Sequence, residues 1–200
     1  MPAPKTLLAL AGAPSEPPPL RESAVLVIDA QNEYVDGALA LPGVKPALDR
    51  IAALLRRARN VGAPIIHVRH LGRAGSLFDP DAPRGAIADP AKPVGGETVI
   101  GKKLPNAFAG TDLHTALTAT GMRNLIVCGF MTHMCVSSTV RAALDLGYRS
   151  IVPAAATATR DLPDAVTGAT LPAAAIQSAS LTALSDRFAT VVGDASAIPD

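Results

Sequence analysis

Residues 129–140, GFMTHMCVSSTV, mark the point where the chain is expected to turn from a strand into a helix. The apolar run NLIVC at residues 124–128 predicts a buried strand just before it. The residues after it predict a helix over 132–147 that ends at Gly147. Cys135, one of two cysteines, therefore follows the carboxyl end of a strand, where open α/β sheets bind their ligands.

The pattern of strand and helix continues on both sides of this stretch. Strands are expected over residues 23–30, 63–70, 97–103, 123–130, 148–156 and 189–193, and helices over 42–62, 110–121, 132–147 and 170–188. This alternation predicts an α/β fold with a doubly wound, mainly parallel β-sheet and helices on both faces, in three αβα layers. We expect an N-terminal arm over residues 1–22 and a single domain over residues 23–200. The irregular connection over residues 72–97 is long enough to suggest a lid or an interface.

Composition excludes several classes of protein. The chain has 48% hydrophobic and 18% charged residues and a net charge of +1, which predicts a globular protein with no nucleic-acid or membrane partner. Two cysteines do not form a disulfide framework, so a reducing, cytoplasmic location is expected. The segment TLLALAGA at residues 6–13 also resembles a short signal peptide, but the proline-rich stretch that follows favours an arm.

Two cysteines receive different interpretations. Cys128 lies within the strand and is expected to fill space in the core. Cys135 lies near the start of the following helix, where free N–H groups and the helix dipole would stabilise a thiolate and a developing oxyanion. Position alone leaves open whether Cys135 is a nucleophile or a second small core residue.

Carboxylate and ammonium groups follow two other predicted strands. Asp29 ends an apolar strand, where it would serve either as a general base or as a cap of the next turn, and Gln31 and Tyr34 would line the same mouth. Lys102 and Lys103 end another strand and point to opposite faces, so only one of them would enter a pocket. A lysine near both Asp29 and Cys135 would lower the pKa of each.

Three stretches together resemble the isochorismatase-like cysteine hydrolases, which include nicotinamidases, N-carbamoylsarcosine amidases and isochorismatases. They are VLVIDAQNEY at residues 25–34, GKKLPNAFAGTDL at 101–113 and GFMTHMCVSSTVRAALDLGY at 129–148. The likeness extends over residues 23–192. It implies an Asp-Lys-Cys catalytic triad, which the motifs place at Asp29, Lys102 and Cys135. Lys102 is preferred to Lys103 because it stands six positions before the motif phenylalanine, Phe108.

The resemblance also implies the surroundings of the nucleophile. A non-proline cis peptide is expected between Phe130 and Met131, and the oxyanion hole would be formed by the backbone N–H groups of Met131 and Cys135. Aromatic residues near the motifs suggest that Tyr34, Phe108 and Phe130 help to bind substrate, together with Gln31.

The implied function is cleavage of an amide or ureido C–N bond of a small molecule through a cysteine thioester. Two alternatives stay open: a vinyl-ether hydrolase of the isochorismatase type that uses Asp29 and Lys102 without covalent catalysis, and a non-catalytic binding protein. The sequence does not identify the substrate. Family members are commonly dimers or tetramers, so a homo-oligomer is expected.

The positions of the histidines indicate whether a metal ion is expected. Nicotinamidases bind a metal through an Asp-x-His pair, which this sequence does not have in the region HVRHLGRAG, residues 67–75. His67 and His70 would point to opposite faces of a strand, so neither a metal nor another cofactor is expected. His67 is interpreted as a core residue or as one that supports the site from behind, His70 as facing the crevice, and His133 as a rim or interface residue.

Overall fold

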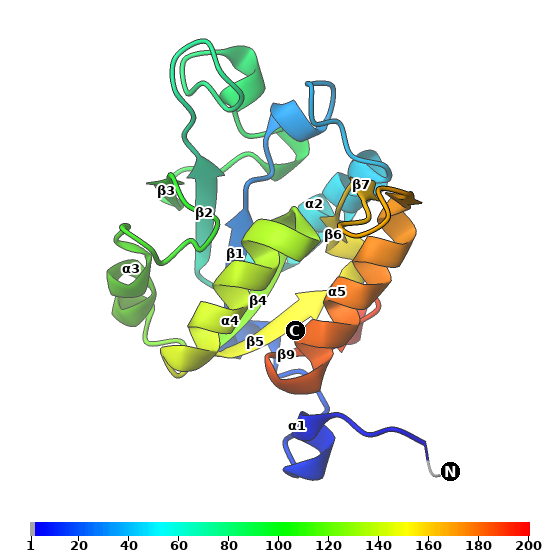
Figure 1. The fold of residues 1–200 in the computed structure, drawn as a ribbon. Coiled ribbons are helices and arrows are strands. Elements are labelled where there is room, and N and C mark those ends of the chain that lie inside the picture. Colours follow the sequence, from blue (N-terminus) through cyan, green and yellow to red (C-terminus); the bar gives the residue numbers. More distant parts are fainter. Residues whose placement is uncertain (1–2) are drawn as a thin grey trace.

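The computed structural model describes residues 3–200, which form a parallel sheet between two layers of helices (Figure 1). The strand order is β3-β2-β1-β4-β5-β9, with a short β6 paired to β4, and every pair in this sheet is parallel. The predicted doubly wound α/β fold is confirmed. The strands are β1 Ser23–Ile28, β2 Ile65–His70, β3 Thr98–Lys102, β4 Asn124–Phe130, β5 Arg149–Pro153, β6 Thr157–Ala158 and β9 Ala189–Val192.

The order of the strands creates a switch point between β1 and β4. From β1 the chain adds β2 and β3 on one side, and then returns to add β4, β5 and β9 on the other. Crossovers that leave two neighbouring strands in opposite directions open a crevice at their carboxyl ends. The residues that follow β1 and β4 therefore lie where a ligand site is expected.

Helices cover both faces of the sheet. Helix α2, Val44–Asn60, packs on one face, and α3 Leu113–Thr120, α4 Ser137–Asp145 and α5 Ala173–Arg187 pack on the other (Figure 1). Side chains of a strand alternate between these layers, so that Val25 and Val27 join the α2 core while Leu26 and Ile28 join the opposite core. Because β1 is buried on both faces, it is apolar at every position after Ser23.

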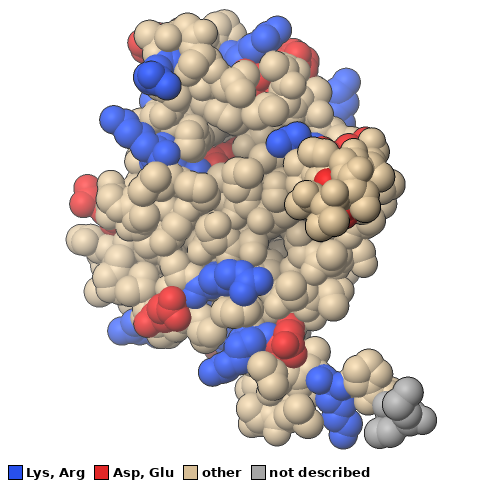
Figure 2. All heavy atoms as spheres, in the orientation of Figure 1, with Lys and Arg blue, Asp and Glu red and all other residues tan. Residues whose placement is uncertain are grey.

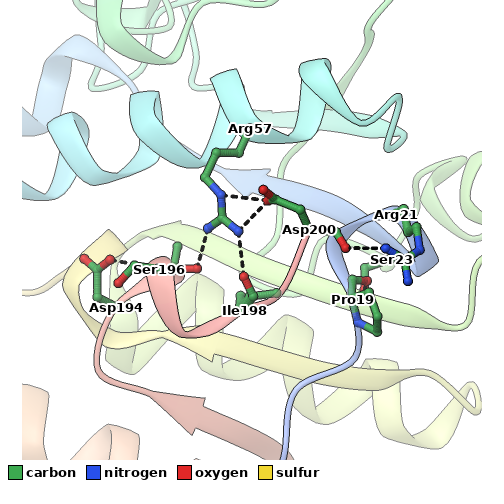
Figure 3. A network of polar contacts seen from close by, with 9 residues as sticks. Pro19, Arg21, Ser23, Arg57, Asp194, Ser196, Ile198 and Asp200 are labelled. Atoms are coloured by element: carbon green, nitrogen blue, oxygen red, sulfur yellow. Dashed lines mark hydrogen bonds and ion pairs between the residues drawn. The ribbon is translucent and has the colours of Figure 1, made fainter.

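The described N-terminal residues, from residue 3 on, and the C-terminal residues pack near the amino ends of the strands. The N-terminal residues include a short helix, α1 Leu7–Leu10, whose Leu7 amide donates to Asp186 of α5 at 2.8 Å. At the C-terminus, Arg57 of α2 donates to Asp200 Oδ1 at 2.9 and 2.6 Å and to the carbonyls of Ala195 and Ile198 at 2.7 and 2.6 Å (Figure 3). One guanidinium thus joins helix α2 to the last residues of the chain.

The long connection over residues 72–97 covers the carboxyl end of the sheet. It has no strand or α-helix of its own, and its two 3₁₀ turns are Pro83–Gly85 and Asp89–Ala91. An isolated antiparallel bridge joins Ile87 to Gln31, just after β1. Other short elements are the antiparallel pair β7 Leu162–Pro163 and β8 Thr170–Leu171, and 3₁₀ turns at Leu20–Glu22, Asn32–Tyr34, Ala154–Ala156 and Ala195–Ala197.

Charges are dispersed over the visible face of the molecule. Basic and acidic side chains are interspersed on a largely uncharged surface, without a broad area of one sign (Figure 2). Within residues 3–200, no helix is both long and apolar enough to cross a membrane.

Candidate active site

Asp29, Lys102 and Cys135 meet at the carboxyl end of the sheet. Asp29 follows β1, Lys102 is the last residue of β3, and Cys135 follows β4. Lys102 Nζ lies 2.7 Å from Asp29 Oδ2 and 3.3 Å from Cys135 Sγ. The long lysine side chain spans β2 and brings its ammonium group to the switch point between β1 and β4.

The neighbouring lysine has a different place. Lys102 is 1% exposed, whereas Lys103 is an exposed residue that lines a surface pocket. Alternation along an extended strand accounts for the difference, because successive side chains point to opposite faces.

The turn that carries Cys135 differs from the expected one. Residues Thr132–Val136 form a π-helical turn, in which the Val136 amide donates to the Met131 carbonyl at 3.2 Å, and the α-helix begins only at Ser137. The helix predicted over 132–147 therefore begins as a π-helical turn, and Cys135 lies near its start, as expected. Its i→i+5 hydrogen bond spans one residue more than that of an α-helix, and such turns are frequent at functional sites.

Close backbone approach shapes the crevice beside this turn. Gly129 has a φ of +111°, and a Cβ atom there would lie 1.9 Å from the Ile28 carbonyl oxygen of the adjacent strand. The peptide bond from Phe130 to Met131 is cis. On the other side of the crevice, Asp29 has a φ of +48°, in the left-handed region that Asp adopts more readily than most residues.

Burial controls the ionisation of the three groups. Asp29, Lys102 and Cys135 are 0%, 1% and 4% exposed. Burial raises the pKa of the Cys135 thiol to about 12; Asp29 adds to the increase, and Lys102 opposes it. Burial also raises the pKa of Asp29 above its usual value, again against the effect of Lys102.

A lysine near both groups was expected to lower the pKa of each. Lys102 does act in that direction on both groups, but desolvation is the larger effect. Cys135 is therefore a protonated thiol at neutral pH in the resting site, with a carboxyl group as neighbour. An attack by sulfur would require transfer of its proton to Asp29 in the reaction itself.

Aromatic rings cover the crevice. Tyr34 packs against Phe78 with ring centroids 5.1 Å apart and against Phe130 at 5.8 Å, and Phe78 also packs against His70 at 5.3 Å. Tyr34 and Phe130 were expected here. Phe108 was expected too, but its ring stacks on Tyr148 at 6.0 Å, beside the amino end of β5, so it does not belong to this group.

Gln31 is committed to structural contacts. Its side-chain amide donates to the carbonyls of His70 at 3.0 Å and Gly85 at 2.8 Å, while its Oε1 accepts from the His70 amide at 2.8 Å. The residue is fully buried. Its expected contact with substrate is therefore replaced by a contact with β2 and the 72–97 segment.

The histidines lie largely as expected. His67 is buried and pairs through Nε2 with Glu97 Oε2 at 2.9 Å, whereas His70 Nδ1 lies 3.2 Å from Lys102 Nζ. His133 is half-buried and contacts Thr159. Among residues 3–200, no three His, Cys, Asp or Glu side chains are gathered in a way that would hold a metal ion.

Two residues near the crevice were not singled out from the sequence. Phe78 comes from the 72–97 segment, whose irregular path hides its contacts, although its φ of +59° marks an unusual backbone position. Arg160 follows β6, and its Nε is buried without a hydrogen-bond partner in the protein. Burial, and then the charge of Arg160, lower the pKa of His133. Neither residue lies in a recognisable motif.

A parallel sheet whose buried carboxyl, ammonium and thiol groups meet at the switch point is the architecture of an α/β enzyme. Residues 23–196 match the model of the Isochorismatase domain. The chain thus belongs to the isochorismatase family, as the sequence motifs suggested, and it is a hydrolase.

Relatives extend over nearly the whole domain. The crystal structure of an isochorismatase from Pseudomonas putida KT2440 is 46% identical, with a TM-score of 0.92, and covers 97% of this chain and 99% of that one. A streptothricin hydrolase of Streptomyces noursei is 40% identical over 177 residues, which are 88% of this chain and 64% of the relative. N-carbamoylsarcosine amidase from Thermoplasma acidophilum is 25% identical with a TM-score of 0.71, over 84% of this chain and 94% of that one.

Proposed function

We propose that the protein hydrolyses an amide or ureido C–N bond of a small molecule, with Cys135 as nucleophile, Asp29 as proton acceptor and donor, and Lys102 as the cation that holds them together. The observation that carries the proposal is the position of Lys102 Nζ, 2.7 Å from Asp29 Oδ2 and 3.3 Å from Cys135 Sγ in a buried crevice. Support also comes from relatives that are amidohydrolases by name.

The first half of the reaction forms a thioester. Asp29 accepts the thiol proton as the Cys135 sulfur attacks the substrate carbonyl carbon, and the carbonyl electron pair moves to oxygen. The N–H groups of Met131 and Cys135 are proposed to donate to that oxyanion. When the C–N bond breaks, the carboxyl group of Asp29 gives its proton to the departing nitrogen, so an amine or ammonia leaves.

The second half restores the enzyme. Asp29, again a carboxylate, takes a proton from a water molecule whose oxygen attacks the thioester carbon. The C–S bond then breaks, the acid product forms, and the proton returns from Asp29 to the Cys135 sulfur. Lys102 remains an ammonium group throughout and offsets the negative charge that moves between carboxylate, sulfur and oxyanion.

The surroundings of the three groups favour a small substrate. The rings of Tyr34, Phe78 and Phe130 cover the crevice and leave the triad nearly without solvent contact. A neighbouring pocket of about 490 Å³ is bordered by His70 and Phe78 and is the proposed way in. The position of Phe108 beside Tyr148 removes it from the proposed binding residues.

A panel of small amides, ureido acids and isochorismate tests the proposal. Turnover of an amide or ureido compound by the wild type, and its loss in Cys135→Ala, are expected. Turnover of isochorismate that survives Cys135→Ala would instead favour the non-covalent vinyl-ether reaction, and no turnover at all would favour a binding role. Cys128→Ala is the matched control, since Cys128 is buried in β4 and contacts the Leu26 carbonyl at 3.8 Å. Assembly as a dimer or tetramer and a cytoplasmic location stay predictions of the sequence.

A further inference from the structure

The Lys102 ammonium has a third neighbour besides the two proposed catalytic groups. His70 Nδ1 lies 3.2 Å from Lys102 Nζ. An ammonium has three N–H donors and no acceptor, and here three acceptors surround it: Asp29 Oδ2 at 2.7 Å, Cys135 Sγ at 3.3 Å and His70 Nδ1. The histidine completes the set of bonds that fixes the direction of the lysine side chain.

We propose that His70 is a positioning residue of the triad, whose unprotonated Nδ1 accepts a hydrogen bond from Lys102 and holds the ammonium between Asp29 and Cys135. This inference rests on the proposed function. Because Lys102 can only donate, the Nδ1 atom carries a lone pair and the ring proton is on Nε2. Protonation of Nδ1 would remove this acceptor. It would also place a second positive charge, on the imidazole, beside the Lys102 ammonium.

The fold places His70 where this role requires it. In the parallel register of β2 and β3, His70 is paired with Lys102, so the two side chains leave neighbouring strands at the same level. The Gln31 side chain bonds both the amide and the carbonyl of His70, at 2.8 and 3.0 Å. The imidazole packs edge-on against Phe78, with ring centroids 5.3 Å apart. Backbone and ring are therefore both held.

Charges around the imidazole oppose its protonation. Lys102 faces it from β3, and behind the ammonium lie Asp29 after β1 and Cys135 after β4. Arg73 and Lys103 line the same pocket as His70. The only carboxylate among these groups is already paired with Lys102. Burial, and then Lys102, lower the pKa of His70 below its usual value, so that it is neutral near neutral pH and protonates only in acid.

Two substitutions separate the ability of His70 to accept a hydrogen bond from its ability to take up a proton. His70→Asn keeps an acceptor near the position of Nδ1 and does not titrate, whereas His70→Leu removes the acceptor. Alkylation of Cys135 by iodoacetamide needs no substrate and reports its thiolate, which Lys102 stabilises. We expect His70→Leu to be alkylated about ten- to hundredfold more slowly, as for loss of a hydrogen bond to a charged group, and His70→Asn at about the wild-type rate.

The pH dependence gives a second readout. The logarithm of the wild-type alkylation rate should fall more steeply below the pKa of His70 than above it, and His70→Asn should show one slope throughout. Nitrogen-15 NMR of the four histidines, assigned by the signal lost in His70→Asn, should show the Nε2–H tautomer for His70. This measurement does not depend on the folding of His70→Leu. His114→Asn, an exposed histidine near Tyr148, is the control and should leave alkylation unchanged.

The inference is overturned by an Nδ1–H tautomer at neutral pH, or by wild-type rate and slope in a folded His70→Leu variant. Failure of the proposed function looks different. If no amide is hydrolysed, or if Cys135→Ala remains active, the proposed amidase function is wrong. The tautomer of His70 and the pH dependence of alkylation still decide whether His70 positions Lys102.

Discussion

Replacement of Lys102 by Met tests the electrostatics of the site most severely. The side chain keeps much of its length but loses the ammonium that lies 2.7 Å from Asp29 Oδ2. Both side chains of this pair are fully buried. Removal of one partner of a buried ion pair costs about 3–5 kcal/mol, because the remaining charge is left without compensation. We expect a loss of this size in the free energy of unfolding wherever Asp29 would have to stay ionised.

The loss should depend on pH in one direction. Burial already raises the pKa of Asp29, and the charge and hydrogen bond of Lys102 are the largest effects that oppose it, so the pKa rises further in Lys102→Met. A group whose pKa is raised in the folded state contributes stability that is fully present below its unfolded pKa of about 4, and this contribution is lost as pH rises through the folded pKa. Urea unfolding between pH about 4 and about 8 should therefore show a deficit that grows with pH.

Activity should fall as well. Because the pKa of Asp29 rises further without Lys102, less carboxylate is present to accept the thiol proton, and we expect turnover to drop by about 10²–10⁴. Lys103→Met is the matched control and should leave both stability and turnover unchanged, because that side chain is exposed. Asp29→Asn combined with Lys102→Met should recover most of the stability but none of the activity, because neither charge remains to be buried alone. Wild-type turnover in Lys102→Met, with a stability deficit that does not change with pH, would refute the reasoning.

Three further outcomes follow from other contacts. Gly129→Ala would place a Cβ 1.9 Å from the Ile28 carbonyl oxygen at a residue with a φ of +111°. It should lower the free energy of unfolding by more than about 2 kcal/mol in urea titrations. Gly193→Ala, where the space is open, is the control, and equal stability of the two variants would contradict this. Arg57→Met removes the donor to Asp200 and to the Ala195 and Ile198 carbonyls. It should lower the free energy of unfolding by about 1–3 kcal/mol in thermal melts without changing turnover. An unchanged melting temperature would mean that these hydrogen bonds do not stabilise the fold. Absorbance of thiolate should be absent near neutral pH, since the pKa values of Cys128 and Cys135 are both raised to about 12; a strong signal from Cys135 in Cys128→Ala near neutral pH would mean that Lys102 outweighs burial.

The fold could be predicted from the sequence because strands that are buried on both faces consist almost entirely of apolar residues. β1 and β4 are apolar after their first residue, and α2 buries Val44, Leu48, Ile51 and Leu55 at helical spacing. A glycine follows each of the helices α2, α3 and α4 within two residues, and these glycines predicted where the helices end. The carboxyl ends of β1 and β4 then identified Asp29 and Cys135 as candidates.

Other features depend on contacts that no local pattern records. The π-helical turn at Cys135 and the pair β7–β8 are too short to show a period. Phe108 stands in a motif close to Lys102, but its ring packs towards Tyr148 because the chain turns before α3. Gln31 became a structural residue only when the 72–97 segment brought Gly85 to it. The pKa directions were missed because the depth of burial, which outweighs the effect of Lys102, comes from packing.

The central claim is that the Cys135 sulfur becomes bonded to the substrate carbonyl carbon with the help of Asp29 and Lys102. Intact-protein mass spectrometry during turnover of an amide from the panel measures this directly. The account predicts an acyl adduct that maps to Cys135, forms in the wild type and in Cys128→Ala, and is absent from Cys135→Ala, which is inactive. Sustained turnover by Cys135→Ala, or an adduct on any other residue in its place, would contradict it.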